Sequence, residues 1–190
     1  ARVRWALTYP ELYEVGSSNL GHIILYSILN ALPGQVCDRS YLPAADLAAR
    51  LRQREQALFG VESRWPLNAF DILGFSLSYE LGATNILEML DLCRVPIRAA
   101  DRGDLPLNHP EAPPLIFAGG PTATSNPEPY AAFFDFIALG DGEELLAEIG
   151  LVLAEGKQAG LTRSALLLDL ALVPGVYVPS LYAPGPDGVG

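Results

Sequence analysis

The sequence predicts an α/β fold with a doubly wound parallel sheet, and three observations support this prediction. Residues 115–118 and 136–139 are apolar without alternation, which is typical of strands buried on both faces by helices. Five candidate strands alternate with segments of helical spacing along the chain. The runs at 115–118 and 136–139 each end in a glycine turn, and the carboxyl ends of such strands are where parallel sheets bind ligands.

The first part of the chain predicts a strand-helix-strand-helix unit. Residues 3–8 form a mostly apolar strand that stops before Pro10, because proline removes a ladder donor. After a loop at 11–16, a helix is expected with Ser17 or Ser18 as its cap and an end near 32–34. Residues 36–41 fit a second strand, and 43–53 fit a second helix.

The remaining strands follow in the middle of the chain. Residues 58–61 are too short to separate an edge strand from an irregular apolar plug, whereas 71–77 predict a central strand. After it we expect a helix at 80–93 and a surface loop at 98–113. A strand at 115–118, a short helix at 127–133 and a strand at 136–139 follow.

A long helix is expected to open at Asp141, which forms an acidic variant of the capping box with Glu144. A further helix at 162–172 and a proline-rich extended passage end the chain. Right-handed crossovers then favour the flavodoxin-like, Rossmann-like strand order 2-1-3-4-5 for about five parallel strands. We expect residues 1–156 to form this domain, and 157–190 to form an extra helix and an extended linker toward a domain absent from this chain.

Composition excludes several classes of function. The chain has 190 residues, of which 50% are hydrophobic and 18% charged, which fits one globular domain. A net charge of -10 argues against a nucleic-acid-binding surface, since neutralising phosphates needs clustered Lys and Arg. With no apolar run long enough to span a bilayer and no signal-peptide pattern, we expect a cytoplasmic protein without a membrane partner.

The common catalytic motifs are missing from the chain. It has no P-loop and no G-x-G-x-x-G after the first strand, which disfavours nucleotide hydrolysis and an NAD site. Cys37 and Cys93 lie far apart in sequence and are expected to be reduced, packed thiols. His22 and His109 stand alone, and His22 is expected to cap or pack, although it starts a helix near the ligand edge. We therefore predict no catalytic residue and no metal ligand in this chain.

Three loops are expected to converge on the carboxyl edge of the sheet. They carry Glu11-x-Tyr13-x-x-Gly16, then Ser76-x-Ser78, then Gly119 with Gly120. The paired glycines permit unusual dihedrals and close approach of a ligand, and a tight turn without a ligand is the alternative explanation. We expect a bulky residue at either glycine to block ligand uptake without harming the fold.

In order and character these loops resemble the D-x-H-x-x-G, S-x-L and G-G signatures of the cobalamin (B12)-binding domain. Glu11 replaces the aspartate, Tyr13 stands at the histidine and Ser78 replaces the leucine. The chain is most similar to the N-terminal cobalamin-binding-like domains of an uncharacterised radical SAM protein family, in residues 9–21, 70–80, 119–129 and 140–143. A phenol is a poor axial ligand for cobalt, so the resemblance implies a base-off, histidine-off corrinoid.

The resemblance also implies a set of cofactor-binding residues. Some would line the corrinoid face and the glycines would flank its nucleotide tail; the candidates are Tyr13, Gly16, Ser76, Ser78, Tyr79, Gly119, Gly120 and Thr122. A radical SAM centre needs three closely spaced cysteines for its 4Fe-4S cluster, and the chain has no such trio. The cluster and S-adenosylmethionine are therefore expected only in the absent C-terminal radical SAM domain of the same polypeptide, which would make the full-length protein the enzyme.

Two other functions remain open at this point. The first is a degenerate B12-like fold without a cofactor, acting as a docking or substrate-recognition module for the radical SAM domain. The second is a flavodoxin-like flavin binder, in which Ser17 and Ser18 would contact the phosphate of the flavin.

Overall fold

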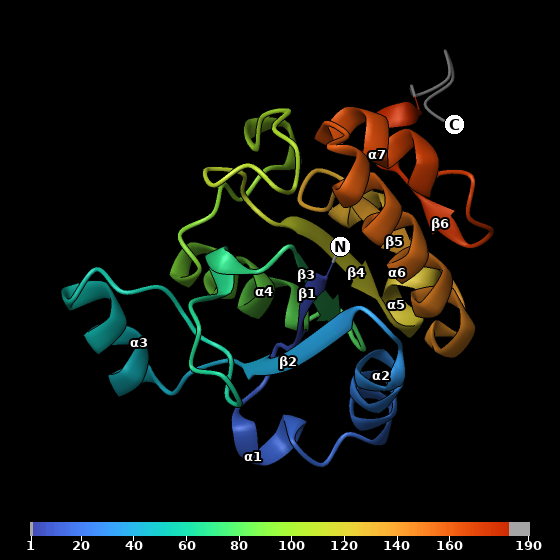
Figure 1. The fold of residues 1–190 in the computed structure, drawn as a ribbon. Helices are drawn as coiled ribbons and strands as arrows, with labels where there is room; N and C mark the ends of the chain where they lie inside the picture. Colours follow the sequence, from blue (N-terminus) through green and yellow to red (C-terminus); the bar gives the residue numbers. More distant parts are fainter. Residues whose placement is uncertain (1, 183–190) are drawn as a thin grey trace.

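The computed structural model describes residues 2–182 and contains a six-stranded, mostly parallel sheet with helices on both faces (Figure 1). The sheet has the order β2-β1-β3-β4-β5-β6, so the predicted order of the five parallel strands is confirmed and a sixth strand is added. The strands are β1 (Val3–Tyr9), β2 (Gln35–Tyr41), β3 (Ile72–Ser76), β4 (Leu115–Gly119), β5 (Phe136–Ala138) and β6 (Val176–Tyr177).

Strand β6 corrects the prediction of an extended passage after residue 173. It pairs antiparallel with β5, and the backbone N of Leu139 donates to the carbonyl of Gly175 at 2.7 Å. Gly175 has φ 89, and a Cβ at this position would lie 3.0 Å from the oxygen of Leu139. This glycine therefore lets the returning chain approach the sheet closely enough to pair with it. Residues 183–190 of the expected tail lie outside the described residues.

The helices divide into two layers (Figure 1). α2 (Leu20–Ala31), α6 (Gly142–Ala159) and α7 (Arg163–Leu170) cover one face, while α3 (Ala45–Gln53), α4 (Gly82–Leu92) and the short α5 (Pro121–Ser125) contribute to the core on the other. Side chains alternate along each strand, so that Trp5 and Leu7 join the first core and Ala6 joins the second. No helix among residues 2–182 has the length and apolar character needed to cross a bilayer.

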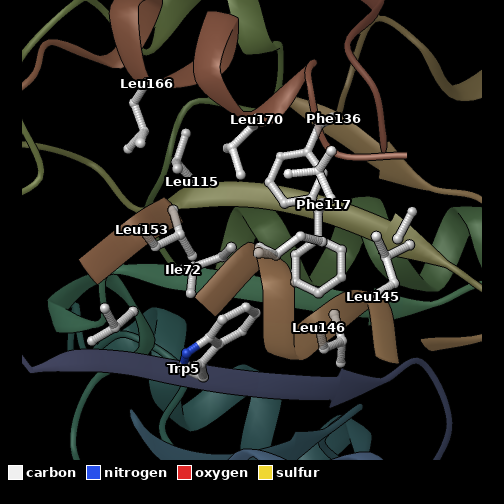
Figure 2. Packing of buried hydrophobic residues seen from close by; sticks show 14 of the residues in the cluster. Trp5, Ile72, Leu115, Phe117, Phe136, Leu145, Leu146, Leu153, Leu166 and Leu170 are labelled. Atoms are coloured by element: carbon white, nitrogen blue, oxygen red, sulfur yellow. The ribbon is translucent and has the colours of Figure 1, made fainter. Parts of the chain in front are cut away.

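Aromatic side chains fill the first core between the sheet and α6 (Figure 2). The rings of Phe117 and Phe136 stack with centroids 5.0 Å apart, and Trp5 meets Phe117 edge-on at 6.0 Å. A Cβ on Gly74 would lie 2.4 Å from the Phe117 ring, so the glycine makes room for this ring. The core at this end of the sheet is thus built from large flat groups over a glycine.

Several local predictions need correction. Asn19, not Ser17 or Ser18, caps α2, because its Oδ1 accepts the backbone N of His22 at 2.9 Å. Asp141 stands at the N-cap of α6 but makes no side-chain cap hydrogen bond, so the expected capping box does not form.

Three irregular segments also differ from or refine the predictions. The expected short helix at 127–133 is reduced to a 3-10 turn at Glu128–Tyr130, and α5 was not predicted. The loop at 11–16 contains the single helical turn α1 (Tyr13–Gly16). Residues 58–61 do not form one of the strands of the sheet. Phe59 makes an isolated antiparallel bridge to Pro66.

Two aspartates organise the amino edge of the sheet, just before β3 and β5. Asp71 Oδ2 accepts the backbone N of Arg4 at 2.7 Å, and Asp135 Oδ2 accepts the backbone N of Ile116 at 2.7 Å. Each carboxylate thus binds the start of a neighbouring strand. Each is also paired with two cations, Asp71 with Arg4 and Lys157, and Asp135 with Arg102 and Arg163.

Candidate functional site

A cavity of about 370 Å³, here called cavity 1, opens at the carboxyl edge of the sheet beside the first turns of α2 and α6. Apart from His22, its buried lining is apolar and includes Leu7, Phe117 and Leu146. Its more exposed lining is polar and consists of Asn19, Ser76, Ser78, Asp141 and Glu143. An apolar interior with a polar rim suits a ligand that has a flat apolar part and hydrogen-bonding substituents.

The glycine pair at the end of β4 lets the loop after β3 approach the sheet closely, and the two glycines differ in how much space a side chain would have. The backbone N of Leu77 donates to the oxygen of Gly119 at 2.8 Å, so the loop after β3 lies directly against the pair. Gly120 has φ 110, and a Cβ there would lie 2.8 Å from the Leu77 oxygen. A Cβ on Gly119 would meet the Ala138 oxygen at an ordinary 3.6 Å. The expectation that both glycines accept a side chain without harm to the fold is therefore wrong for Gly120 and remains possible only for Gly119.

His22 is a buried polar wall of cavity 1. Its ring lies edge-on to Tyr9 at 5.7 Å and to Tyr41 at 5.5 Å, and its Nε2 has no hydrogen-bond partner among the described residues. Burial lowers the pKa of His22 to about 4, and the positive charge of Arg39 acts in the same direction. The imidazole is thus neutral near pH 7 and offers the cavity an uncharged nitrogen heterocycle.

The acidic part of the rim comes from the turn between β5 and α6. Asp141 is exposed and leaves its carboxylate free of the capping bond that its position suggested, and Glu143 follows it on the first turn of the helix. The hydroxyls of Ser76 and Ser78 lie on the rim as well. Carboxylates accept hydrogen bonds only, so this rim favours a ligand rich in N–H or O–H donors.

Four of the eight predicted site residues line cavity 1, and the other four do not. Those in the lining are Ser76, Ser78, Gly119 and Gly120. Tyr79 is exposed, and Thr122 uses its backbone N to bind the oxygen of Leu77 at 3.2 Å. The role of all eight in binding stays a prediction.

Tyr13 and Gly16 belong to a separate cluster of aromatic residues. Tyr13 is 54% exposed, and its ring packs edge-on against Tyr41 at 5.2 Å, beside a hollow other than cavity 1. A Cβ on Gly16 would lie 2.7 Å from the Tyr41 ring and 2.9 Å from the Tyr9 ring. The glycine of the Glu11-x-Tyr13-x-x-Gly16 pattern is thus explained by packing.

Sequence reasoning missed Asn19, Asp141 and Glu143 as lining residues of cavity 1. A signal for the last two was present, because they follow β5 just as Gly119 ends the adjacent β4, and neighbouring parallel strands end at one edge. His22 was expected to cap or pack. It does pack, and it faces the ligand edge too.

The described residues contain no cluster of three His, Cys, Asp or Glu side chains suited to hold a metal ion. Cys37 and Cys93 are buried in the cores on opposite faces of the sheet. Burial raises the pKa of both thiols, which keeps them protonated.

Comparison with known proteins gives one family and one solved structure. A family model described as the N-terminal region of radical SAM proteins matches residues 21–179, well over half of the chain. None of the curated proteins compared with the chain matches it.

The solved structure is that of the radical S-adenosylmethionine methyltransferase TsrM from Kitasatospora setae with tryptophan substrate and a SAM analogue bound. It is 16% identical, with a TM-score of 0.48, and the match covers 91% of the present chain and 28% of that chain. A similarity of this size carries no argument about activity or substrate.

Proposed function

Because the chain belongs to the family of N-terminal regions of radical SAM proteins, we propose that it is an accessory domain that binds a base-off, histidine-off corrinoid in cavity 1. In this proposal the domain presents the cofactor to the radical SAM domain of the same polypeptide. That domain also holds the 4Fe-4S cluster and S-adenosylmethionine, since this chain has only two cysteines.

The observation that carries the proposal is the division of cavity 1 into an apolar interior and a polar rim. Leu7, Phe117 and Leu146 offer a surface for the flat heterocycle of a corrinoid nucleotide tail. The cavity is large enough for such a group and not for a whole corrin ring, which would lie outside over the loops that end the strands. Asp141 and Glu143 would accept hydrogen bonds from amide substituents of the corrin.

The histidine-off state is supported by Tyr13, which stands where the cobalamin-binding signature has its histidine. Tyr13 stands outside cavity 1, and a protonated phenol is a poor ligand for cobalt. His22 is held between two tyrosines inside the wall, where its neutral ring would contact the apolar part of a ligand. The chain therefore contributes shape and hydrogen bonds, while a bound corrinoid would supply organometallic chemistry to the radical SAM domain.

The proposal is tested by a visible absorption titration of the purified chain with hydroxocobalamin and methylcobalamin, followed by desalting. We expect retained corrinoid with a base-off spectrum. Gly119→Val should abolish retention, because a Cβ there is tolerated by the backbone and two further methyl groups enter the cavity. The control Ala159→Val adds bulk at an exposed position on α6, outside cavity 1, and should behave as the native chain does.

Retention that is equal in the native chain and in Gly119→Val would overturn the assignment to cavity 1. No retention by a chain whose circular dichroism shows it to be folded would overturn the corrinoid itself. Bound flavin after incubation with FMN would instead support the flavodoxin-like alternative.

A specific observation favours the second candidate function, a docking module without a cofactor. The loops after β1 and β3 expose large apolar side chains around the carboxyl edge, namely Leu12, Tyr13, Val15, Leu20, Tyr79 and Leu81. The first turn of α4 holds the loop after β1 in place, since Asn85 Nδ2 donates to the oxygen of Pro10 at 2.8 Å. Such a surface suits a protein partner, here the radical SAM domain. Leu81→Asp should weaken association between the separated domains, and unchanged association would count against docking at this edge.

A further inference from the structure

A second cavity, here called cavity 2, lies at the amino edge of the sheet, opposite to cavity 1. It has a volume of about 480 Å³ and is enclosed by the segments 98–103 and 131–135, the first turn of α7, and Pro179 with Ser180. Asp135 and Arg163 form its buried wall, while Arg98, Ser164 and Ser180 are exposed lining residues.

Two buried guanidinium groups share one carboxylate beside cavity 2: Arg163 and Asp135 line it, and Arg102 lies behind the lining. The side chains of Arg102, Asp135 and Arg163 are 0%, 2% and 5% exposed. Burial lowers the pKa of Arg102 although Asp135 acts against this, and the charge of Arg163 adds to the lowering. An uncompensated buried charge is costly unless a counter-ion or hydrogen bonds offset it.

Hydrogen bonds satisfy Arg102 but not Arg163. All three nitrogens of Arg102 donate, to Asp135 and to backbone oxygens. Arg163 Nη2 donates to the oxygens of Pro113 and Pro114 at 2.6 and 3.0 Å. Its Nη1 lies 2.8 Å from Asp135 Oδ1 without the alignment of a hydrogen bond, and its Nε has no partner among the described residues. A charged side chain that lines the cavity thus keeps a buried Nε without a partner.

The exposed lining of cavity 2 has the matching chemistry. Arg98 makes no ion pair within residues 2–182, and the hydroxyl of Ser180 is a hydrogen-bond donor that adapts to an acceptor. Two carboxylates outside the lining, Asp101 and Asp104, are exposed, and Asp104 accepts the backbone N of Ser164 at 2.6 Å as well as its hydroxyl. Solvent screens these carboxylates more than the buried guanidinium.

We propose that cavity 2 is an oxyanion site that takes a carboxylate or phosphate group, with Arg163 as the buried donor and Arg98 as the exposed cation. Oxyanions match guanidinium geometry and would offset the surplus buried charge. The proposal concerns the edge opposite to cavity 1 and does not depend on corrinoid binding.

The test is a titration of the purified chain with inorganic phosphate and, separately, with acetate, each against sodium chloride of equal ionic strength. The melting temperature should rise with saturation in at least one of the two arms, and calorimetry should give a matching dissociation constant. The arm that responds identifies the kind of oxyanion. A saturable rise of the melting temperature with phosphate but not with acetate indicates a phosphate ligand. A saturable rise with acetate indicates a carboxylate ligand.

Three variants keep the test decisive. Arg98→Gln removes an exposed cation and should weaken binding about threefold without unfolding the chain. Ala100→Glu puts a carboxylate on the exposed lining and should weaken binding by more than about tenfold. The matched control Arg54→Gln makes the same charge change at an exposed position outside cavity 2 and should bind as the native chain does.

Two outcomes would overturn the oxyanion site. One is the absence of any saturable rise over sodium chloride in both arms. The other is a rise that Ala100→Glu and Arg54→Gln leave equally unchanged, because binding would then lie elsewhere. Arg163→Gln is a weaker test, since loss of a buried guanidinium also destabilises the fold.

Discussion

The two edges of the sheet each bury a nitrogen-bearing side chain with an unpaired atom, but the two side chains differ in charge. At the carboxyl edge, the neutral ring of His22 lies among aromatic and aliphatic groups. At the amino edge, the charged Arg163 lies beside a carboxylate that it shares with Arg102. Burial alone therefore does not define a site. The charge that stays buried decides whether the cavity suits a flat uncharged group or an anion.

The largest effect is expected from breaking the charged edge. Asp135→Asn should reduce the free energy of unfolding by about 3–5 kcal/mol, because it leaves two buried guanidinium groups without a counter-ion. Asp71→Asn should cost less, about 1–3 kcal/mol, since its partners Arg4 and Lys157 are 38% and 14% exposed and can recover water. Urea unfolding of the two variants measures the difference. An equal or larger loss for Asp71→Asn would contradict the view that the Asp135 cluster is the more deeply buried charge.

The neutral state of His22 at the carboxyl edge is tested by the pH dependence of the unfolding free energy. The folded pKa of His22, about 4, lies below its ordinary value of 6.5, so the unfolded chain binds this proton first as the pH falls. The stability that His22 contributes is therefore fully present above pH 6.5 and decreases by about 3 kcal/mol as the pH falls to 4.

The variant His22→Phe keeps an aromatic ring between Tyr9 and Tyr41 and removes the titrating group. Its unfolding free energy should fall less steeply than that of the native chain between pH 6.5 and 4, with little difference at pH 8. Parallel pH profiles of the two proteins, measured by urea unfolding, would show that folding does not lower the pKa of His22.

Gly119 and Gly120, beside cavity 1, are expected to differ in how well they accept a side chain. Gly120→Ala should cost about 1–3 kcal/mol, because it forces a Cβ into the positive φ region and against the Leu77 oxygen. Gly119→Ala should change the stability by less than about 1 kcal/mol. Thermal unfolding of both variants provides the test, and similar losses at the two positions would show that the close approach of the Leu77 loop does not set the requirement for glycine.

The smallest effect is expected at Tyr13, which resemblance placed in the site and the fold places outside cavity 1. Tyr13→Phe keeps the edge-on contact with Tyr41 and should change the unfolding free energy by less than about 0.5 kcal/mol. Corrinoid retention after desalting should also be unchanged. A clear loss of retention would extend the ligand site from cavity 1 to the aromatic cluster of Tyr13.

The order of the five parallel strands could be predicted from the amino-acid sequence. Unbroken apolar runs such as 115–118 require helices on both faces, and the alternation with helical segments together with right-handed crossovers leaves few strand orders. These signals are local in the chain, so they are readable without contacts. The same holds for the glycine pair at the end of β4, which indicated the edge where cavity 1 is found.

The side chains that share a cavity and the charges that share a partner could not be predicted from the sequence, because the fold brings them together. β6 exists because Gly175 fits against Leu139, and the buried charge cluster exists because Arg163 reaches Asp135 across 28 positions of sequence. Nothing local to either residue signals these contacts. His22 likewise becomes a neutral cavity wall only when Tyr9 and Tyr41 enclose it. The physical reason is that burial and pairing are properties of residues brought together by the fold, whereas strand and helix patterns are properties of neighbours in the chain.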